Sequence, residues 1–80
     1  MDTRAAVARR IEALCKERSI TINALSYISG VANSTIKGIF YSRSKNPGIV
    51  TIKKLCDGLD ITLGEFFSTP EFDALEQEIK

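Results

Sequence analysis

A single glycine separates two short apolar runs in the middle of the chain, and this break constrains the fold more than any other feature. The first run carries Ile22 and Leu25 and stops at Gly30. The second run starts almost at once and includes Ile36. Glycine can adopt the positive φ that ends one helix and turns the chain sharply. Residues 21–40 therefore predict two short helices joined at a steep angle, a helix-turn-helix.

Apolar residues recur at helical spacing along the rest of the chain, and no segment alternates as a strand would. Thr21 is suited to cap the second helix, and Thr62 and Glu65 form a capping box for the fifth. We expect an all-α fold, a compact bundle of five short helices in which the second and third form the helix-turn-helix, followed by a short C-terminal helix. The expected helices cover residues 3–18, 22–29, 33–41, 49–59, 63–67 and 71–79.

Positive and negative charges are separated along the chain, although the net charge is only +1. Residues 1–54 hold ten basic and three acidic side chains, and residues 55–80 hold one basic and seven acidic side chains. Such a division favours nucleic-acid binding, and the alternative is that exposed charges only keep the protein soluble. We expect a helix-turn-helix domain over residues 1–67 and an acidic segment over residues 68–80 that packs on this domain or on a partner.

The composition argues against an enzyme and against a metal or cofactor site. The chain has no histidine, so Cys15 and Cys56 lack the usual base for thiol catalysis and cannot form a closed zinc site. Both lie on apolar faces and are expected to be reduced packing residues, with a disulfide as the alternative. No small-molecule ligand is expected. Without a long apolar run or a signal peptide, we expect a cytoplasmic protein that does not enter membranes.

Four motifs follow one another in a fixed order over residues 21–67. They read Thr21-x3-Leu25-Ser26-x3-Gly30-Val31, then Ser34-Thr35-Ile36, then Asn46-Pro47 after a basic loop, then Leu59-x-Ile61-Thr62-Leu63-x-Glu65-Phe66-Phe67. In this order they resemble the lambda-repressor-like, Cro-type (XRE) DNA-binding domain. The resemblance covers roughly residues 7–67 and implies a five-helix bundle that binds operator DNA, usually as a dimer.

The start of the third helix carries side chains that can read bases. Asparagine can bond adenine with two hydrogen bonds, serine can bond either kind of base edge, and lysine can reach guanine or phosphate. The resemblance implies base contacts at Asn33, Ser34 and Gly38, and we add Thr35 and Lys37 to this set. Asn33 and Ser34 are also favoured helix caps. If Asn33 caps the helix, reading passes to Ser34, Thr35 and Lys37.

A second set of residues is expected to bind DNA phosphates. The basic loop after the third helix can reach the DNA backbone, and so can the N–H groups at the start of the second helix. The alternative for the loop is an ordinary solvated surface. The expected phosphate contacts are Thr21, Asn23, Arg43, Ser44, Lys45 and Asn46.

Two functions therefore stay open. The first is a sequence-specific regulator of transcription, by preference a repressor, that inserts the third helix into the major groove of double-stranded DNA as a homodimer. The second is a protein-binding module or antitoxin-like partner with the same fold. That module would use Tyr27 and Ile28 together with an apolar face of Phe72, Leu75 and Ile79, which could instead close the core.

Overall fold

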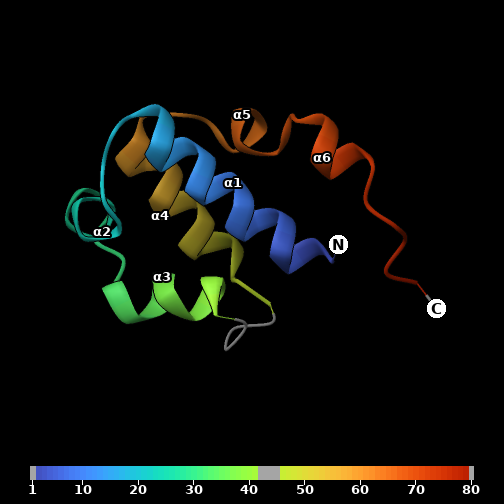
Figure 1. Ribbon diagram of the computed structural model, residues 1–80, viewed down its shortest axis with the longest axis horizontal. Helices are drawn as coiled ribbons and strands as arrows, with labels where there is room; N and C mark the ends of the chain where they lie inside the picture. Colours follow the sequence, from blue (N-terminus) through green and yellow to red (C-terminus); the bar gives the residue numbers. More distant parts are fainter. Residues whose placement is uncertain (1, 42–45, 80) are drawn as a thin grey trace.

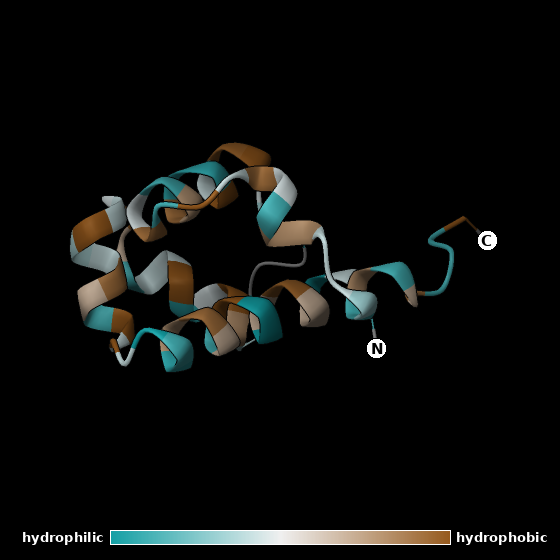
Figure 2. Ribbon diagram, turned by 90° about the horizontal axis from the view of Figure 1, so that it is seen from above, coloured by the Kyte–Doolittle hydropathy of each residue, from teal (hydrophilic) through white to brown (hydrophobic). Residues whose placement is uncertain are grey.

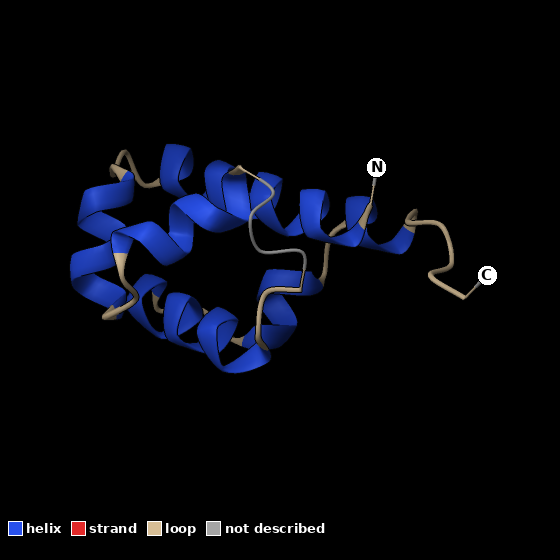
Figure 3. Ribbon diagram, turned by 90° about the horizontal axis from the view of Figure 1, so that it is seen from below, coloured by secondary structure: helices blue, strands red, loops and turns tan. Residues whose placement is uncertain are grey.

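The protein is entirely helical over the residues that the structure describes, which are 2–41 and 46–79. In this computed structural model, α-helices follow one another and no strand occurs within the described ranges (Figure 1, Figure 3). The predicted all-α class and the helix-turn-helix of the second and third helices are confirmed. The helices are α1 (Thr3–Glu17), α2 (Ile22–Ser29), α3 (Asn33–Phe40), α4 (Ile49–Leu59), α5 (Leu63–Phe67) and α6 (Pro70–Asp73).

The helices pack into one bundle that leaves α3 at the surface. α2 contacts both α3 and α4, whereas α1 contacts α3 and α6, and α5 packs against α4. In Figure 1, α3 lies along one edge of the molecule, and α5 and α6 lie along the opposite edge. The second helix of the helix-turn-helix is therefore supported from inside the bundle and open on its outer side.

One apolar core runs through the bundle and receives side chains from α1 to α5. Figure 2 shows hydrophobic and hydrophilic residues mixed along the helices, as expected when each helix has one buried face. The most deeply buried large side chains are Phe66, Ile11, Leu25, Ile36, Ile39, Leu55, Leu59 and Cys56. Because all five helices contribute to this core, the position of each one depends on the others.

The turn between α2 and α3 has the geometry predicted for Gly30. This residue ends α2 in the left-handed conformation, with φ 73° and ψ 9°. Two serine side chains close the turn around Val31. Ser26 Oγ donates a hydrogen bond to the Val31 carbonyl at 2.6 Å, and Ser29 Oγ accepts one from the Val31 N–H at 3.2 Å. These bonds fix the direction in which α3 leaves α2.

The backbones of α2 and α4 approach each other closely at Gly58. A Cβ atom at this position would lie 2.9 Å from Cα and 3.0 Å from Cβ of Ser29. Interiors are close-packed, so a methyl group at this point has no free space to enter. Glycine is therefore required at position 58 by the approach of α2.

α5 is a helix of one to two turns and depends on side-chain caps at both ends. At its start, Thr62 Oγ1 accepts from the Glu65 N–H at 3.0 Å, and Glu65 Oε1 accepts from the Thr62 N–H at 2.9 Å, which confirms the capping box. At its end, Arg10 Nε donates to the Phe66 carbonyl at 2.8 Å, and Nη2 donates to the Glu65 carbonyl at 2.9 Å. A cation from α1 thus satisfies carbonyl groups that the end of α5 leaves unpaired.

The C-terminal segment differs from the predicted helix over residues 71–79. α6 ends at Asp73, and Ile79 is 85% exposed. Phe72 packs against the core, with its ring centroid 5.0 Å from that of Phe67, but the chain continues without helical structure. Phe72 is only partly buried, and such a helix gains too little from burial to offset its conformational entropy. The prediction of a single apolar face on Phe72, Leu75 and Ile79 was therefore wrong.

Two polar contacts join this acidic segment to α1. Glu71 Oε1 lies 3.4 Å from Nε of Arg9. Farther along, Glu78 Oε2 accepts a hydrogen bond from the Thr3 hydroxyl at 2.6 Å. Both contacts are exposed to solvent, so each contributes little to stability. They nevertheless show that the segment after α5 lies along α1.

Replacing Gly58 with alanine should destabilise the protein by about 1–3 kcal/mol, because the new methyl group would push α2 away from α4 at Ser29. This loss should appear even though alanine is the better helix former. Urea unfolding followed by circular dichroism measures it. Gly64→Ala is a matched control, because the nearest atom to its new Cβ would be 3.7 Å away. Equal stability of the two variants would contradict a tight α2–α4 contact.

Replacing Asp60 with glycine should raise the free energy of unfolding by a few tenths of a kcal/mol to about 1 kcal/mol. Asp60 ends α4 in the left-handed conformation, with φ 57° and ψ 44°, and glycine adopts this conformation without steric conflict. Thermal melting of Asp60→Gly and Asp60→Ala should move in opposite directions. A lower melting temperature for the glycine variant would show that the carboxylate has a stabilising contact of its own.

Candidate nucleic-acid interface

One side of α3 is anchored in the core and the other is open to solvent. Ile36 and Ile39 are buried and hold the helix in the bundle. Ser34, Thr35 and Lys37 are exposed. Ser34 and Lys37 are three positions apart and share a helix face that is turned away from the buried isoleucines, whereas Thr35, four positions before Ile39, lies at the border of the buried side. Three of the five predicted base-reading residues are therefore accessible to a ligand from outside.

The start of α3 shows that Asn33 is not a helix cap. The N-cap is Ala32, and no side chain accepts a capping hydrogen bond there. The Ala32 carbonyl instead accepts from the N–H groups of Thr35 and Ile36, at 3.0 and 3.2 Å. Asn33 is the first helical residue, so the alternative interpretation of its side chain as a cap was wrong.

The Asn33 side chain instead joins the starts of α2 and α3. Its Nδ2 donates a hydrogen bond to Oδ1 of Asn23, in the first turn of α2. Its Oδ1 is buried and has no hydrogen-bond partner among the described residues. Asn23 is exposed, so its own amide nitrogen can donate to an acceptor outside the protein. The pair thus places an accessible donor at the start of α2.

Gly38, the last of the predicted base-reading residues, differs from Ser34, Thr35 and Lys37 in being buried. It is buried in α3, between the exposed Lys37 and the buried Ile39. Glycine has no side chain, so a contact with a base would have to come from its backbone. Little of that backbone is accessible, because Gly38 is buried.

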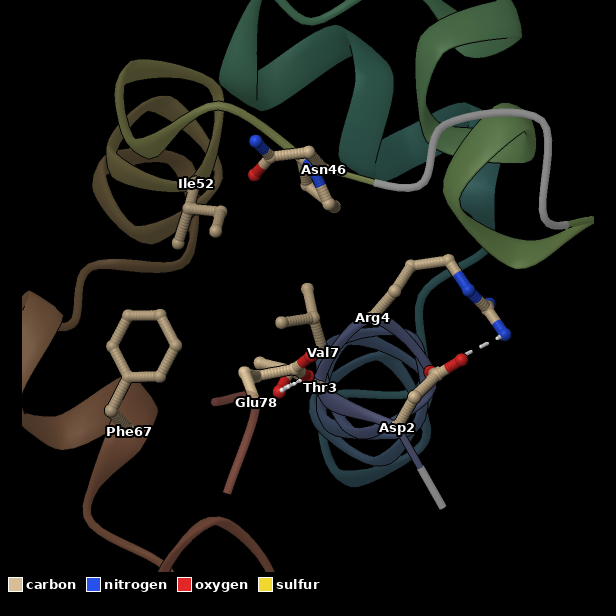
Figure 4. A pocket seen from close by; sticks show the side chains of 9 residues that line it. Asp2, Thr3, Arg4, Val7, Asn46, Ile52, Phe67 and Glu78 are labelled. Atoms are coloured by element: carbon tan, nitrogen blue, oxygen red, sulfur yellow. Dashed lines mark hydrogen bonds and ion pairs between the residues drawn. The ribbon is translucent and has the colours of Figure 1, made fainter. Parts of the chain in front are cut away.

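The structure describes only some of the residues that are predicted to contact phosphates. Thr21 is the N-cap of α2, and its Oγ1 accepts from the Ala24 N–H at 3.0 Å. The hydroxyl proton of Thr21 can still be donated to a further acceptor. Asn46 is exposed and lines the hollow that Figure 4 shows between α1 and the start of α4. Three predicted contacts lie outside the described residues: Arg43, Ser44 and Lys45.

Several basic side chains that contribute to the positive charge of residues 1–54 are engaged within the protein. They are Arg4, Arg9, Arg10 and Lys53. In the described part of the chain, no ion pair or side-chain hydrogen bond involves four other exposed cations, Lys16, Arg18, Lys37 and Lys54. Of these, Lys37 lies on α3. The charge count of the sequence therefore overstates the positive charge that is available to a nucleic acid.

The sequence contains no pattern that predicts which groups Arg4 and Arg10 bind. Arg4 binds the carbonyl group of Ile39, 35 positions away, and Arg10 binds that of Phe66, 56 positions away. Every residue has a carbonyl group, so no residue type marks these partners. Only the folded chain shows that the two arginines stabilise helix ends.

The two cysteines are placed as packing residues. Cys15 and Cys56 are buried and not bonded to each other. Desolvation by burial raises the pKa of both thiols, so they stay protonated and unreactive at neutral pH. No group of Asp, Glu and Cys side chains within residues 2–41 and 46–79 is arranged to hold a metal ion. Across the same residues, no helix has the length and apolar character needed to span a membrane.

Comparison with known proteins agrees with this geometry. Residues 10–71 match the family model described as the Cro/C1-type HTH DNA-binding domain. The fold is also similar to the crystal structure of the prophage Lp1 protein 11, with a TM-score of 0.81 and 33% sequence identity. That match covers 94% of this chain and 100% of the other. No curated protein is significantly similar in sequence.

Proposed function

The chain belongs to the Cro/C1-type helix-turn-helix family of DNA-binding domains, and from this premise we propose that it is a sequence-specific repressor of transcription. It inserts α3 into the major groove of double-stranded DNA, and its DNA-binding domain spans residues 1–67. The main support for this proposal is the solvent-exposed side of α3. There, polar side chains are exposed on a helix whose other side is buried in the core.

The proposed base-reading residues are Ser34, Thr35 and Lys37. Their hydroxyl and ammonium groups can bond the donor and acceptor edges that base pairs present in the major groove. A helix at the edge of the molecule, as α3 is in Figure 1, can enter a groove without collision from its neighbours. The small number of such residues predicts that only a few base pairs in each half-site matter strongly.

Asn33 contributes to DNA binding through Asn23. The Asn33 amide nitrogen is bonded to Asn23, and its oxygen is buried, so neither end is directed at a base. The bond holds the Asn23 amide with its nitrogen available to a phosphate oxygen. Because phosphates are present at every base pair, this contact fixes the position of the protein on DNA and carries no sequence information.

The other proposed phosphate contacts come before and after α3 in the sequence. At the start of α2, the N–H groups of Ala24 and Leu25 are bonded to Thr21, which leaves those of Ile22 and Asn23 for a phosphate. Arg43, Ser44, Lys45 and Asn46 follow the recognition helix in sequence. Phosphate contacts from segments that precede and follow α3 would set its register in the groove.

The repressor acts as a homodimer on a palindromic site. A single module presents a small interface, whereas two modules related by a two-fold axis bind two half-sites and combine their affinities. The half-site centres should be about one helical turn of DNA apart. Occupation of such a site within a promoter would exclude the transcription machinery.

A second candidate function is supported by the outer face of α2. Tyr27 is 89% exposed and Ile28 is 47% exposed. Large apolar side chains together at a surface are typical of protein–protein contacts. A protein partner bound on this face would make the chain an antitoxin-like or protein-binding module. Binding to duplex DNA separates the two functions, because the second does not require it.

Replacing both Arg43 and Lys45 with alanine should weaken binding to all duplexes similarly. If each contacts one phosphate, the slope of log affinity against log salt should become shallower by about two. Fluorescence anisotropy with duplexes at several salt concentrations measures this slope. The matched control is Arg9→Ala with Lys53→Ala, which removes the same charge from side chains paired with Glu71 and Asp57.

The control variant should keep the slope of the unaltered protein. An unchanged slope in the Arg43 and Lys45 variant would exclude the loop from the interface. If the unaltered protein binds no duplex at low salt, the proposed function is wrong.

Asn33→Ala and Ser34→Ala should weaken DNA binding in different ways. Loss of Asn33 should weaken preferred and scrambled duplexes by the same factor, because it releases the phosphate donor Asn23. Loss of Ser34 should cost about 1 kcal/mol on the preferred duplex and relax the preference at one base pair. Selection of bound sites from random duplexes measures both effects. A relaxed base preference in Asn33→Ala would show that Asn33 reads a base itself.

A further inference from the structure

Arg4 reaches from the first turn of α1 to the end of α3. Figure 4 shows its side chain directed toward α3, beside Asp2. Its Nη1 donates a hydrogen bond to the Ile39 carbonyl at 2.9 Å, and its Nη2 lies 3.8 Å from Oδ1 of Asp2. We propose that Arg4 is a positioning residue that sets the orientation of α3 and thereby the ability of the protein to discriminate DNA sequences.

The chemistry of this contact makes it stronger than an average surface interaction. The carbonyl groups in the last turn of a helix have no partner within the helix and carry partial negative charge. The guanidinium of Arg4 supplies both a donor and a positive charge to one of them, that of Ile39. Its side chain is only 17% exposed, so water competes weakly for the bond. Hydrogen bonds to charged groups are stronger than those between neutral groups.

Different side-chain contacts hold the two ends of α3. Its start is held by the turn in which Ser26 bonds Val31 and by the bond between Asn33 and Asn23. Its end is held by Arg4. Without Arg4, α3 keeps the contacts at its N-terminus and its buried isoleucines but loses the charged contact at its C-terminus. A small change in tilt then displaces the side chains that face the groove.

Base reading and phosphate binding respond differently to such a tilt. Hydrogen bonds to base edges require a defined geometry, within about 0.5 Å and 10–20° of the productive arrangement. Phosphate contacts tolerate more movement and are present on every duplex. Loss of Arg4 should therefore reduce the preference for the correct sequence more than the affinity for DNA in general.

Arg4 lies outside the part of the chain that matches the family model. The residues that match the Cro/C1-type model are 10–71, and Arg4 precedes them. The contact arises because α1 begins at Thr3 in this chain, so its first turn reaches the end of α3. The effect on sequence discrimination rests on the proposed function, whereas the effect on the end of α3 can be measured without DNA.

The test compares Arg4→Met with Arg9→Met. Both variants remove one positive charge from α1, but Arg9 contacts Glu71 and not α3. The duplex that the unaltered protein selects from a random pool and a scrambled duplex of the same length serve as ligands. Arg4→Met should lower the ratio of the two affinities by about tenfold. Arg9→Met should leave this ratio unchanged.

Hydrogen exchange gives a second measurement that needs no DNA. The Tyr41 N–H donates to the Lys37 carbonyl at 2.9 Å and closes the last turn of α3. Its exchange should be faster in Arg4→Met and unchanged in Arg9→Met. Arg4→Lys keeps the charge and one donor nitrogen, so it should restore part of the protection and of the ratio if Arg4→Met is poorly folded.

The outcomes separate this inference from the proposed function. If both arginine variants show the same Tyr41 exchange as the unaltered protein, Arg4 does not hold α3 and the inference is overturned. A lower melting temperature of Arg4→Met with an unchanged affinity ratio also overturns it, because Arg4 is then only structural. If the unaltered protein prefers no duplex, the proposed function fails and with it the role in discrimination.

Discussion

The close contact between α2 and α4 at Ser29 and Gly58 is the constraint on which the presentation of α3 depends. α2 is eight residues long, and Leu25 is its one fully buried side chain. Side-chain burial alone therefore cannot fix its position, and the direct approach of the two backbones does so. Once α2 is fixed, the left-handed Gly30 and the serine bonds to Val31 determine where α3 begins. A larger residue at position 58 would therefore change the interface without touching it.

Arginine side chains in this domain replace contacts that short helices cannot make for themselves. α3 and α5 span eight and five residues, so their unpaired terminal groups are a large fraction of each helix. Arg4 binds a terminal carbonyl of α3, and Arg10 binds two of α5. Both cations come from α1, which thereby connects α3 with the opposite edge of the bundle. Their charge is used inside the protein, and less of it remains for DNA.

The candidate interface shows where reasoning from residue types is sufficient and where it is not. Ser34 and Lys37 are exposed because they do not share the helix face of Ile36 and Ile39, a pattern visible in the sequence, whereas Thr35 lies beside Ile39 and only the structure shows that it is exposed. The role of Asn33 could not be predicted, since its amide could cap, read a base or bind another side chain. Its bond with Asn23 depends on the angle between α2 and α3. The burial of Gly38 is likewise seen only in the folded chain.

The sequence by itself determined the features that depend on residues within about four positions of one another. These are the helical periodicity, the left-handed turn at Gly30 and the capping box of Thr62 and Glu65. Only the tertiary structure decided the bond from Arg4 to α3, the need for glycine at position 58 and the end of α6 at Asp73. Each of these depends on atoms distant in the chain, whose approach is set by how the whole core packs.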